Sequence, residues 1–150
     1  WYDRAIKFNS KYPLAWKNKG ITLQAQNKYQ EALDVFDEAI RLYSRDALCW
    51  SRRGLILNAQ GKYIEAIKAF DKAIELDQND SQHWNNKGVT LCMMEKYQDA
   101  FNCFNRANLL DYENALAWYN KGRVLEILNR FKEAENALNK ARELGYSGPP

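Results

Sequence analysis

A tryptophan followed four residues later by a glycine occurs four times in this chain, always in the same register. The pairs are Trp16 and Gly20, Trp50 and Gly54, Trp84 and Gly88, and Trp118 and Gly122. Each pair begins 34 residues after the previous one, and the chain has only five tryptophans. A period of 34 residues predicts pairs of helices stacked in a solenoid, because each pair must bury its apolar face against a neighbour.

Four complete repeats follow from this period, and they cover residues 13–46, 47–80, 81–114 and 115–148. We interpret residues 1–12 as the second helix of a truncated repeat, since Ala5 precedes Ala39 by one period. The connections between repeats are too short to separate domains, so we expect one solenoid over residues 1–150. The chain opens on Trp1 without a Met, and we therefore expect it to be part of a longer protein.

Small and large apolar residues recur at fixed places in every repeat. In the first repeat, Trp16, Gly20 and Leu23 share one face of the first helix, while Ala32 and Phe36 lie on the second. A glycine in mid-helix costs roughly 1 kcal/mol relative to alanine, so its recurrence predicts a close approach of two helices. We expect Gly20 to face Ala32, and we expect the four repeated tryptophans to be largely buried.

The composition narrows the class of protein. Lysine and arginine number 22 against 19 acidic residues, a mild excess without the dense basic cluster typical of nucleic-acid binders. No apolar run approaches the length of a membrane span. The three cysteines, Cys49, Cys92 and Cys103, are an odd number without close pairs, which favours reduced thiols and a cytoplasmic location.

Motifs for catalysis or metal binding are missing from the sequence. The only histidine, His83, stands beside Trp84 at a helix start, where we expect an ordinary, partly exposed side chain. Cys92 and Cys103 lack the spacing of zinc ligands and are better interpreted as buried thiols. No glycine-rich phosphate loop or nucleophile motif occurs. We predict that the chain is not an enzyme and holds no metal or cofactor.

The second complete repeat carries the fullest version of a known pattern: Trp50, Gly54, Gly61, Tyr63, Ala66, Phe70, Ala73 and Leu76. This resembles the tetratricopeptide repeat, and the resemblance covers the whole chain. The chain departs from that family where a cation replaces the leucine before the glycine, at Lys19, Arg53, Lys87 and Lys121. It also departs at Glu95, which stands where a turn glycine is common.

The resemblance implies an all-α, right-handed superhelix of antiparallel helix pairs whose first helices line a concave groove. It also implies a non-catalytic scaffold that binds a peptide or protein segment in that groove. Groove positions in the family are the second, fifth, sixth, ninth and twelfth residues of each repeat. The candidate peptide-binding residues come from the first four of these positions: Leu14, Lys17, Asn18, Ile21, Leu48, Ser51, Arg52, Leu55, Asn85, Asn86, Val89, Leu116, Tyr119, Asn120 and Arg123.

Two features of these positions suggest how a peptide would be held. The amides of Asn18, Asn86 and Asn120 can donate to and accept from a peptide backbone, although they could also be merely solvated. The second feature is an apolar stripe, which signals an interface unless part of it packs inside the solenoid. Its members are Leu14, Ile21, Leu48, Leu55, Val89 and Leu116.

Three other kinds of partner are a chaperone C-terminus, RNA and a second copy of the chain. The family's clamp for chaperone C-termini is not expected, because Lys17 fits it but Ile21 and Arg52 do not. The four cations before the glycines could track an RNA backbone. We favour the alternative that their stems cover the core while their charged groups reach acids such as Asp37 and Asp71. A third possibility is self-association through exposed solenoid ends.

Overall fold

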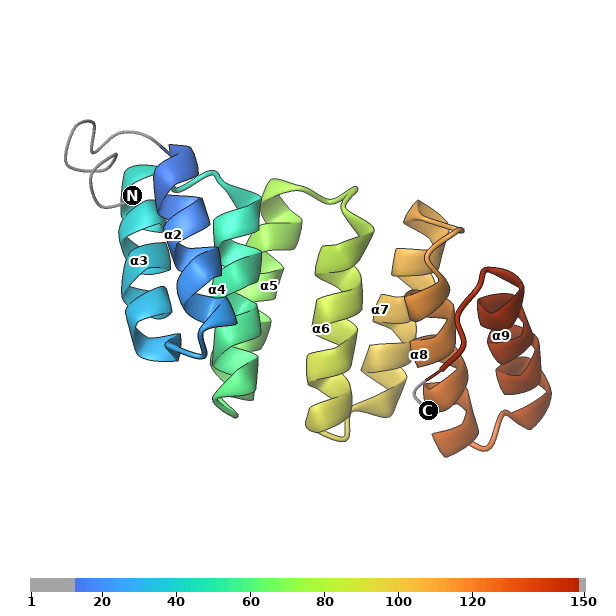
Figure 1. The fold of residues 1–150 in the computed structure, drawn as a ribbon. Helices are drawn as coiled ribbons and strands as arrows, with labels where there is room; N and C mark the ends of the chain where they lie inside the picture. Colours follow the sequence, from blue (N-terminus) through green and yellow to red (C-terminus); the bar gives the residue numbers. More distant parts are fainter. Residues whose placement is uncertain (1–12, 149–150) are drawn as a thin grey trace. The chain divides into compact units, whose positions relative to one another are not determined.

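The computed structural model describes residues 13–148. The truncated repeat expected in residues 1–12 lies outside the described residues. Residues 13–148 contain helices and no strand, in the order α2 (Pro13–Ala25), α3 (Tyr29–Leu42), α4 (Ala47–Ala59), α5 (Tyr63–Leu76), α6 (Ser81–Met93), α7 (Tyr97–Leu110), α8 (Ala115–Ile127) and α9 (Phe131–Glu143) (Figure 1). The expected all-α architecture of helix pairs is confirmed.

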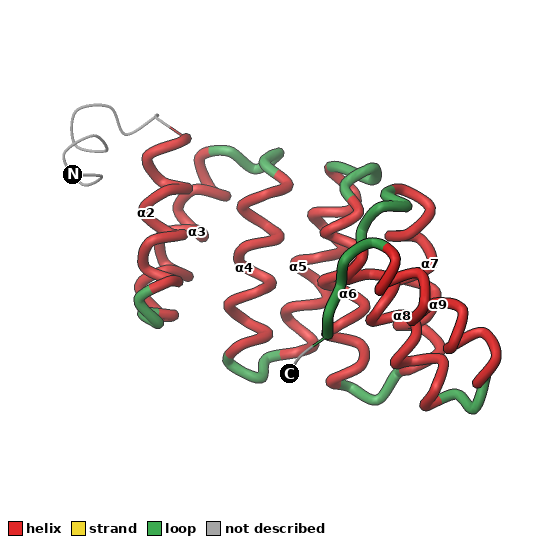
Figure 2. Tube along the Cα trace, turned by 45° about the vertical axis from the view of Figure 1, so that its right-hand side comes forward, coloured by secondary structure: helices red, strands yellow, loops and turns green. Residues whose placement is uncertain are grey.

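The described helices fall into two compact units. Unit 1 extends to Asp77 and holds α2 to α5, while unit 2 begins at Gln78 and holds α6 to α9. Within unit 1, α2 packs on α3 and α4 packs on α5, and α3 joins the two pairs by packing on α4. Unit 2 repeats this scheme with α6 on α7, α8 on α9, and α7 on α8 (Figure 2). The first helices of successive repeats also touch within each unit.

The repeated glycines are sites of close approach between the two helices of a repeat, as expected. A Cβ atom built on Gly54 would lie 2.7 Å from Cε1 of Phe70, and one on Gly20 would lie 2.6 Å from Cζ of Phe36. The nearest atoms are thus those of a large side chain on the second helix, Phe36 and Phe70 here and Leu138 opposite Gly122. In the fourth repeat the alanine equivalent to Ala32 is also close, with the Ala134 carbonyl oxygen 3.3 Å from such a Cβ. These atoms occupy the space that a side chain on the glycine would need.

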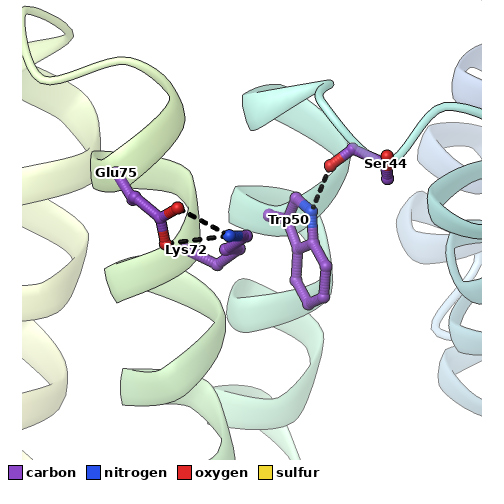
Figure 3. Close-up of polar contacts among 4 residues, drawn as sticks. All are labelled: Ser44, Trp50, Lys72 and Glu75. Carbon is purple, nitrogen blue, oxygen red and sulfur yellow. Dashed lines mark hydrogen bonds and ion pairs between the residues drawn. The ribbon is translucent and has the colours of Figure 1, made fainter.

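The four repeated tryptophans are half-buried, and none of them lies on an open solvent face. Trp16, Trp50 and Trp118 pack against the hydrophobic cores. A polar contact also joins the indole to the helix connection. In three repeats the indole N–H donates to the backbone carbonyl six residues earlier. These bonds join Trp50 to Ser44 (3.1 Å), Trp84 to Gln78 (3.2 Å) and Trp118 to Tyr112 (2.9 Å). Figure 3 shows the first of them, with Lys72 and Glu75 paired nearby on α5.

The short connections inside each repeat require one left-handed residue. This residue is Asn27, Gly61, Glu95 or Asn129, with φ values of 59°, 74°, 58° and 58°. Glycine adopts this conformation freely and asparagine tolerates it, whereas glutamate does so at a cost. At the start of the following repeats, side chains of Asp46, Asp80 and Asn114 accept backbone N–H bonds and cap α4, α6 and α8.

Candidate functional site

The apolar residues at the second position of the repeats are exposed. Leu14 on α2 is 48 % exposed and Leu48 on the neighbouring α4 is 38 % exposed, both within unit 1. Leu116 on α8 of unit 2 is 42 % exposed. Burying a leucine is favourable by about 1.5–3 kcal/mol, so these side chains are suited to contact an apolar partner.

The rest of the expected apolar stripe is only half-exposed. Ile21 and Leu55 pack against the core cluster of unit 1, and Val89 is half-buried in unit 2. In the fourth repeat this position is Arg123, which is exposed and forms an ion pair with Glu126. The stripe is therefore divided, and its outward-facing part consists of the second-position leucines.

Two side chains at the fifth position, those of Lys17 and Asn85, contact the first helix of the following repeat or its N-cap residue. The Lys17 ammonium lies 3.0 Å from the carboxylate of Asp46, the N-cap residue of α4. Ser51 and Asn85 are buried, at 4 % and 3 % exposure, so neither side chain is available to a ligand in this structure. These positions join successive segments of the chain, and we leave Ser51 and Asn85 out of the proposed contact surface.

The fifth position of the last repeat is covered by the tail that follows α9. The rings of Tyr119 and Tyr146 lie 4.5 Å apart between centroids. The backbone N–H of Tyr146 donates a hydrogen bond to the Ala141 carbonyl at the end of α9. The chain reverses there through Gly145, which has a φ of 87°. Sequence reasoning identified Tyr119 but missed this contact, because nothing in the repeat pattern shows the direction of the tail.

The asparagines at the sixth position have different surroundings. Asn120 donates its side-chain N–H to the Oδ1 atom of Asn85, 3.0 Å away, so that amide is already engaged. Asn18 and Asn86 are half-buried, and their backbone carbonyls accept the hydroxyl groups of Thr22 and Thr90. Arg52, which holds the sixth position in the second repeat, is also half-buried. Asn18 and Asn86 are thus the better candidates for peptide contacts.

The cations before the glycines lie against the helices. Arg53 donates to Asp37 at 2.6 Å, which confirms one of the two expected acidic partners. Lys121 lies over aromatic rings instead, with its ammonium 4.8 Å from the centroid of Trp118. All four cations are half-buried. Partial burial of the four side chains is what we expected if they pack against the solenoid and do not bind RNA.

His83 is buried, at 3 % exposure, and the expectation of a partly exposed side chain was wrong. It occupies the third position of its repeat, where Ala15, Cys49 and Ala117 are buried as well, so the position faces inward in every repeat. Its Nε2 atom lies 3.7 Å from a carboxylate oxygen of Asp80. Its Nδ1 atom has no hydrogen-bond partner in the described part of the chain.

The surroundings of Cys49 and Cys92 favour the protonated thiol. Burial, followed by the nearby Asp46 carboxylate, raises the pKa of Cys49 to about 12. Burial also raises the pKa of Cys92 to about 11. A nucleophilic cysteine needs the opposite shift. Within residues 13–148, no group of three or more His, Cys, Asp or Glu side chains is placed to hold a metal ion.

A hollow in unit 1 adjoins the exposed Leu48. It has a volume of about 700 Å³ and is lined by the connection between α3 and α4 together with Leu76 and Asp77. Its apolar side chains include Leu42 and Tyr43, while Arg45 and Asp46 supply charge. The hollow can receive a side chain from a segment that lies across Leu14 and Leu48.

Comparison with protein families decides the classification. The tetratricopeptide repeat model matches residues 17–81 and 94–149, and a second model of the same repeat matches residues 69–102. The chain belongs to the tetratricopeptide repeat family. No curated protein matches the sequence.

Solved tetratricopeptide repeat structures share the fold at low sequence identity. A Pseudomonas aeruginosa pilF structure is 18 % identical with a TM-score of 0.90, covering 98 % of this chain and 67 % of that chain. MamA is 17 % identical with a TM-score of 0.86, covering 95 % of this chain and 84 % of that chain. The second repeat domain of Spaghetti (RPAP3), bound there to an HSP90 peptide, is 24 % identical with a TM-score of 0.64. That alignment covers 65 % of this chain and 91 % of the other.

Tetratricopeptide repeats are in general scaffolds for protein–protein interaction, and catalytic activity is not their usual role. Within residues 13–148, every helix is too short or too polar to cross a membrane.

Proposed function

We propose that this chain is a non-catalytic scaffold that binds an extended protein segment along its first helices. The observation that carries the proposal is the exposure of large apolar side chains at the same repeat position, Leu14 and Leu48 on neighbouring helices of unit 1 and Leu116 in unit 2. Burying them against a partner would remove apolar surface from water. We also propose a cytoplasmic location, on the basis of the reduced, buried thiols.

An extended segment would make two kinds of contact in unit 1. Its apolar side chains would cover Leu14 and Leu48 and enter the hollow beside Leu48, which Leu42 and Tyr43 help to line. Its backbone would hydrogen-bond to the amide of Asn18, which lies one turn from Leu14 on α2. Each neutral hydrogen bond contributes about 0.5–1.5 kcal/mol, so the apolar contacts would provide most of the affinity.

The experiment is a selection of peptides that bind the whole chain from a random display library, followed by titration of the selected peptides. Leu48→Asp should weaken binding at least tenfold, because it places an unpaired charge where an apolar group must dock. The matched control is Ile64→Asp on α5, where an isoleucine is 65 % exposed but lies on a second helix. Equal affinities of the two variants would refute the proposed surface, provided that circular dichroism shows both to be folded.

A second candidate function is self-association, and an exposed aromatic ring favours it. Phe131 at the start of α9 is 64 % exposed, whereas Tyr29, Tyr63 and Tyr97 at the same repeat position are half-buried. If this ring forms an interface between copies of the chain, light scattering should show a dimer that Phe131→Lys converts to a monomer. A monomer at all concentrations would eliminate this candidate.

A further inference from the structure

A cavity of about 360 Å³ lies between α8 and α9 in unit 2. The aromatic rings of Tyr112 and Trp118 line it and meet edge to face at 5.4 Å between centroids, and Leu125 and Lys121 also contribute. Its volume is in the range of sites that hold small molecules or single side chains. Trp118, Lys121 and Leu125 share one face of α8 at helical spacing, and this face differs from that of Leu116 and Asn120. The cavity is therefore separate from the proposed peptide surface.

The two carboxylates that line the cavity already have partners. Glu133 accepts two hydrogen bonds from the guanidinium of Arg130, at 2.8 and 2.7 Å. Glu143 pairs with Lys140 at 3.3 Å. Each acid thus forms an ion pair with a cation other than Lys121. Counted together with Arg130, which pairs with Glu133 but does not line the cavity, the charges around the cavity have an excess of one positive charge, that of Lys121.

Lys121 has no acidic residue 16 positions earlier in the chain, and the carboxylate that acts on it is that of Glu133, which is hydrogen-bonded to Arg130. Arg53, at the same repeat position, binds Asp37, which lies 16 residues earlier. The residue 16 positions before Lys121 is Asn105, which carries no charge. The Lys121 ammonium lies 4.8 Å from the Trp118 centroid and 5.7 Å from that of Phe101. Burial, only partly offset by Glu133, lowers the pKa of this half-buried lysine, which shows that its charge is incompletely solvated.

We propose that this cavity binds a carboxylate attached to an aromatic or other apolar group, with Lys121 as the cation and the Trp118 and Tyr112 rings as the apolar wall. The ligand carboxylate takes the place that Asp37 occupies beside Arg53. Two sources share this chemistry: a free small carboxylic acid, and the C-terminal residue of a peptide. Because the site lies on another face of α8, it does not depend on the proposed peptide surface.

The test is a titration of the full chain, with the indole N–H signal of Trp118 followed by NMR. N-acetylphenylalanine represents a peptide C-terminus, and phenylacetate represents a free small acid. We expect at least one of them to bind with a roughly millimolar dissociation constant or better. The tighter of the two identifies the source of the ligand. N-acetylphenylalaninamide keeps the ring but lacks the carboxylate, and it should bind at least fivefold more weakly than N-acetylphenylalanine if that acid binds.

Three variants assign the interaction to Lys121. Lys121→Gln should lower the affinity for the carboxylic acid at least fivefold. Lys132→Gln removes an exposed cation of α9 that does not line the cavity, and it should leave this affinity unchanged. Asn105→Asp supplies a carboxylate from within the chain and should also lower the affinity for the carboxylic acid. Binding that survives Lys121→Gln in a folded variant overturns the proposal, as does the absence of any shift at Trp118. Unchanged affinity in Asn105→Asp would overturn the role given to the missing carboxylate.

Discussion

The side-chain N–H of Asn120 on α8 donates to the Oδ1 atom of Asn85 on α6, 3.0 Å away, and so joins two successive repeats of unit 2. Asn85 is 3 % exposed, so water cannot readily replace this partner. Sequence reasoning placed both residues on a peptide-binding surface. The structure gives the pair a role in packing between repeats, which changes what their substitution should do.

Asn120→Ala should lower the free energy of unfolding by about 1–3 kcal/mol, because it leaves the buried Oδ1 atom of Asn85 without a donor. Asn86→Ala serves as the control, since Asn86 is half-buried and its side chain takes no part in this pair. Urea denaturation of the two variants gives the comparison. Equal stabilities would contradict the packing role. In a double-mutant cycle, Asn85→Ala and Asn120→Ala together should cost less than the sum of the single changes.

Gly54→Ala should destabilise the chain by about 1–3 kcal/mol through overpacking, even though alanine favours helices more than glycine does. The added Cβ would lie 2.7 Å from Cε1 of Phe70, a fully buried ring that would have to shift. Lys68→Ala, an exposed substitution on α5, should change stability by less than about 0.5 kcal/mol. An unchanged thermal midpoint for Gly54→Ala would show that the ring can shift.

Glu95→Gly should stabilise the chain by about 0.5–1 kcal/mol. The backbone of Glu95 has a φ of 58°, a left-handed conformation that costs roughly 1–2 kcal/mol for a residue with a side chain. Part of this gain is lost because glycine is more flexible in the unfolded chain. Asn129→Gly changes the same turn position in the next repeat, where φ is also 58°, and should gain less because asparagine tolerates this region. Thermal denaturation that ranks the two variants in the opposite order would contradict this account.

The Cys49 thiol should make stability depend on pH in the alkaline range. Its pKa is raised from 9.0 to about 12 on folding, mainly by burial, so the folded state favours the protonated thiol more than the unfolded state does. This contribution is complete below about pH 9 and is lost as the pH rises towards 12. At about pH 10 the loss should be roughly 1 kcal/mol. Cys49→Ala should therefore lose less stability than the parent chain between about pH 7 and pH 10 in urea denaturation. An equal loss of unfolding free energy in the parent chain and in Cys49→Ala over this pH range would contradict the prediction.

Local structure was predictable from the sequence because the same residue pattern occurs in each of the four repeats. The 34-residue period of tryptophan and glycine predicts paired helices, and the helices lie where the period puts them. The turn glycine at Gly61 and the N-cap at Asp46 also follow from residue type alone, since left-handed turns and helix starts have strong local preferences. The second-position leucines were likewise placed on exposed surface by register.

Contacts between side chains of different helices depended on the tertiary structure. The pattern marks Gly20 as a site of close approach, but only the packed helices show that the nearest atoms are those of the Phe36 ring. Burial of His83 and the Asn85–Asn120 hydrogen bond likewise depend on the neighbouring helices.

The sequence by itself determined the family, the repeat boundaries and the helices, because these arise from local preferences and a period repeated four times. The tertiary structure alone decided which polar groups of the expected groove are already satisfied, and that Lys121 lies over an aromatic ring where Arg53 binds a carboxylate, because both depend on distances between atoms far apart in the chain.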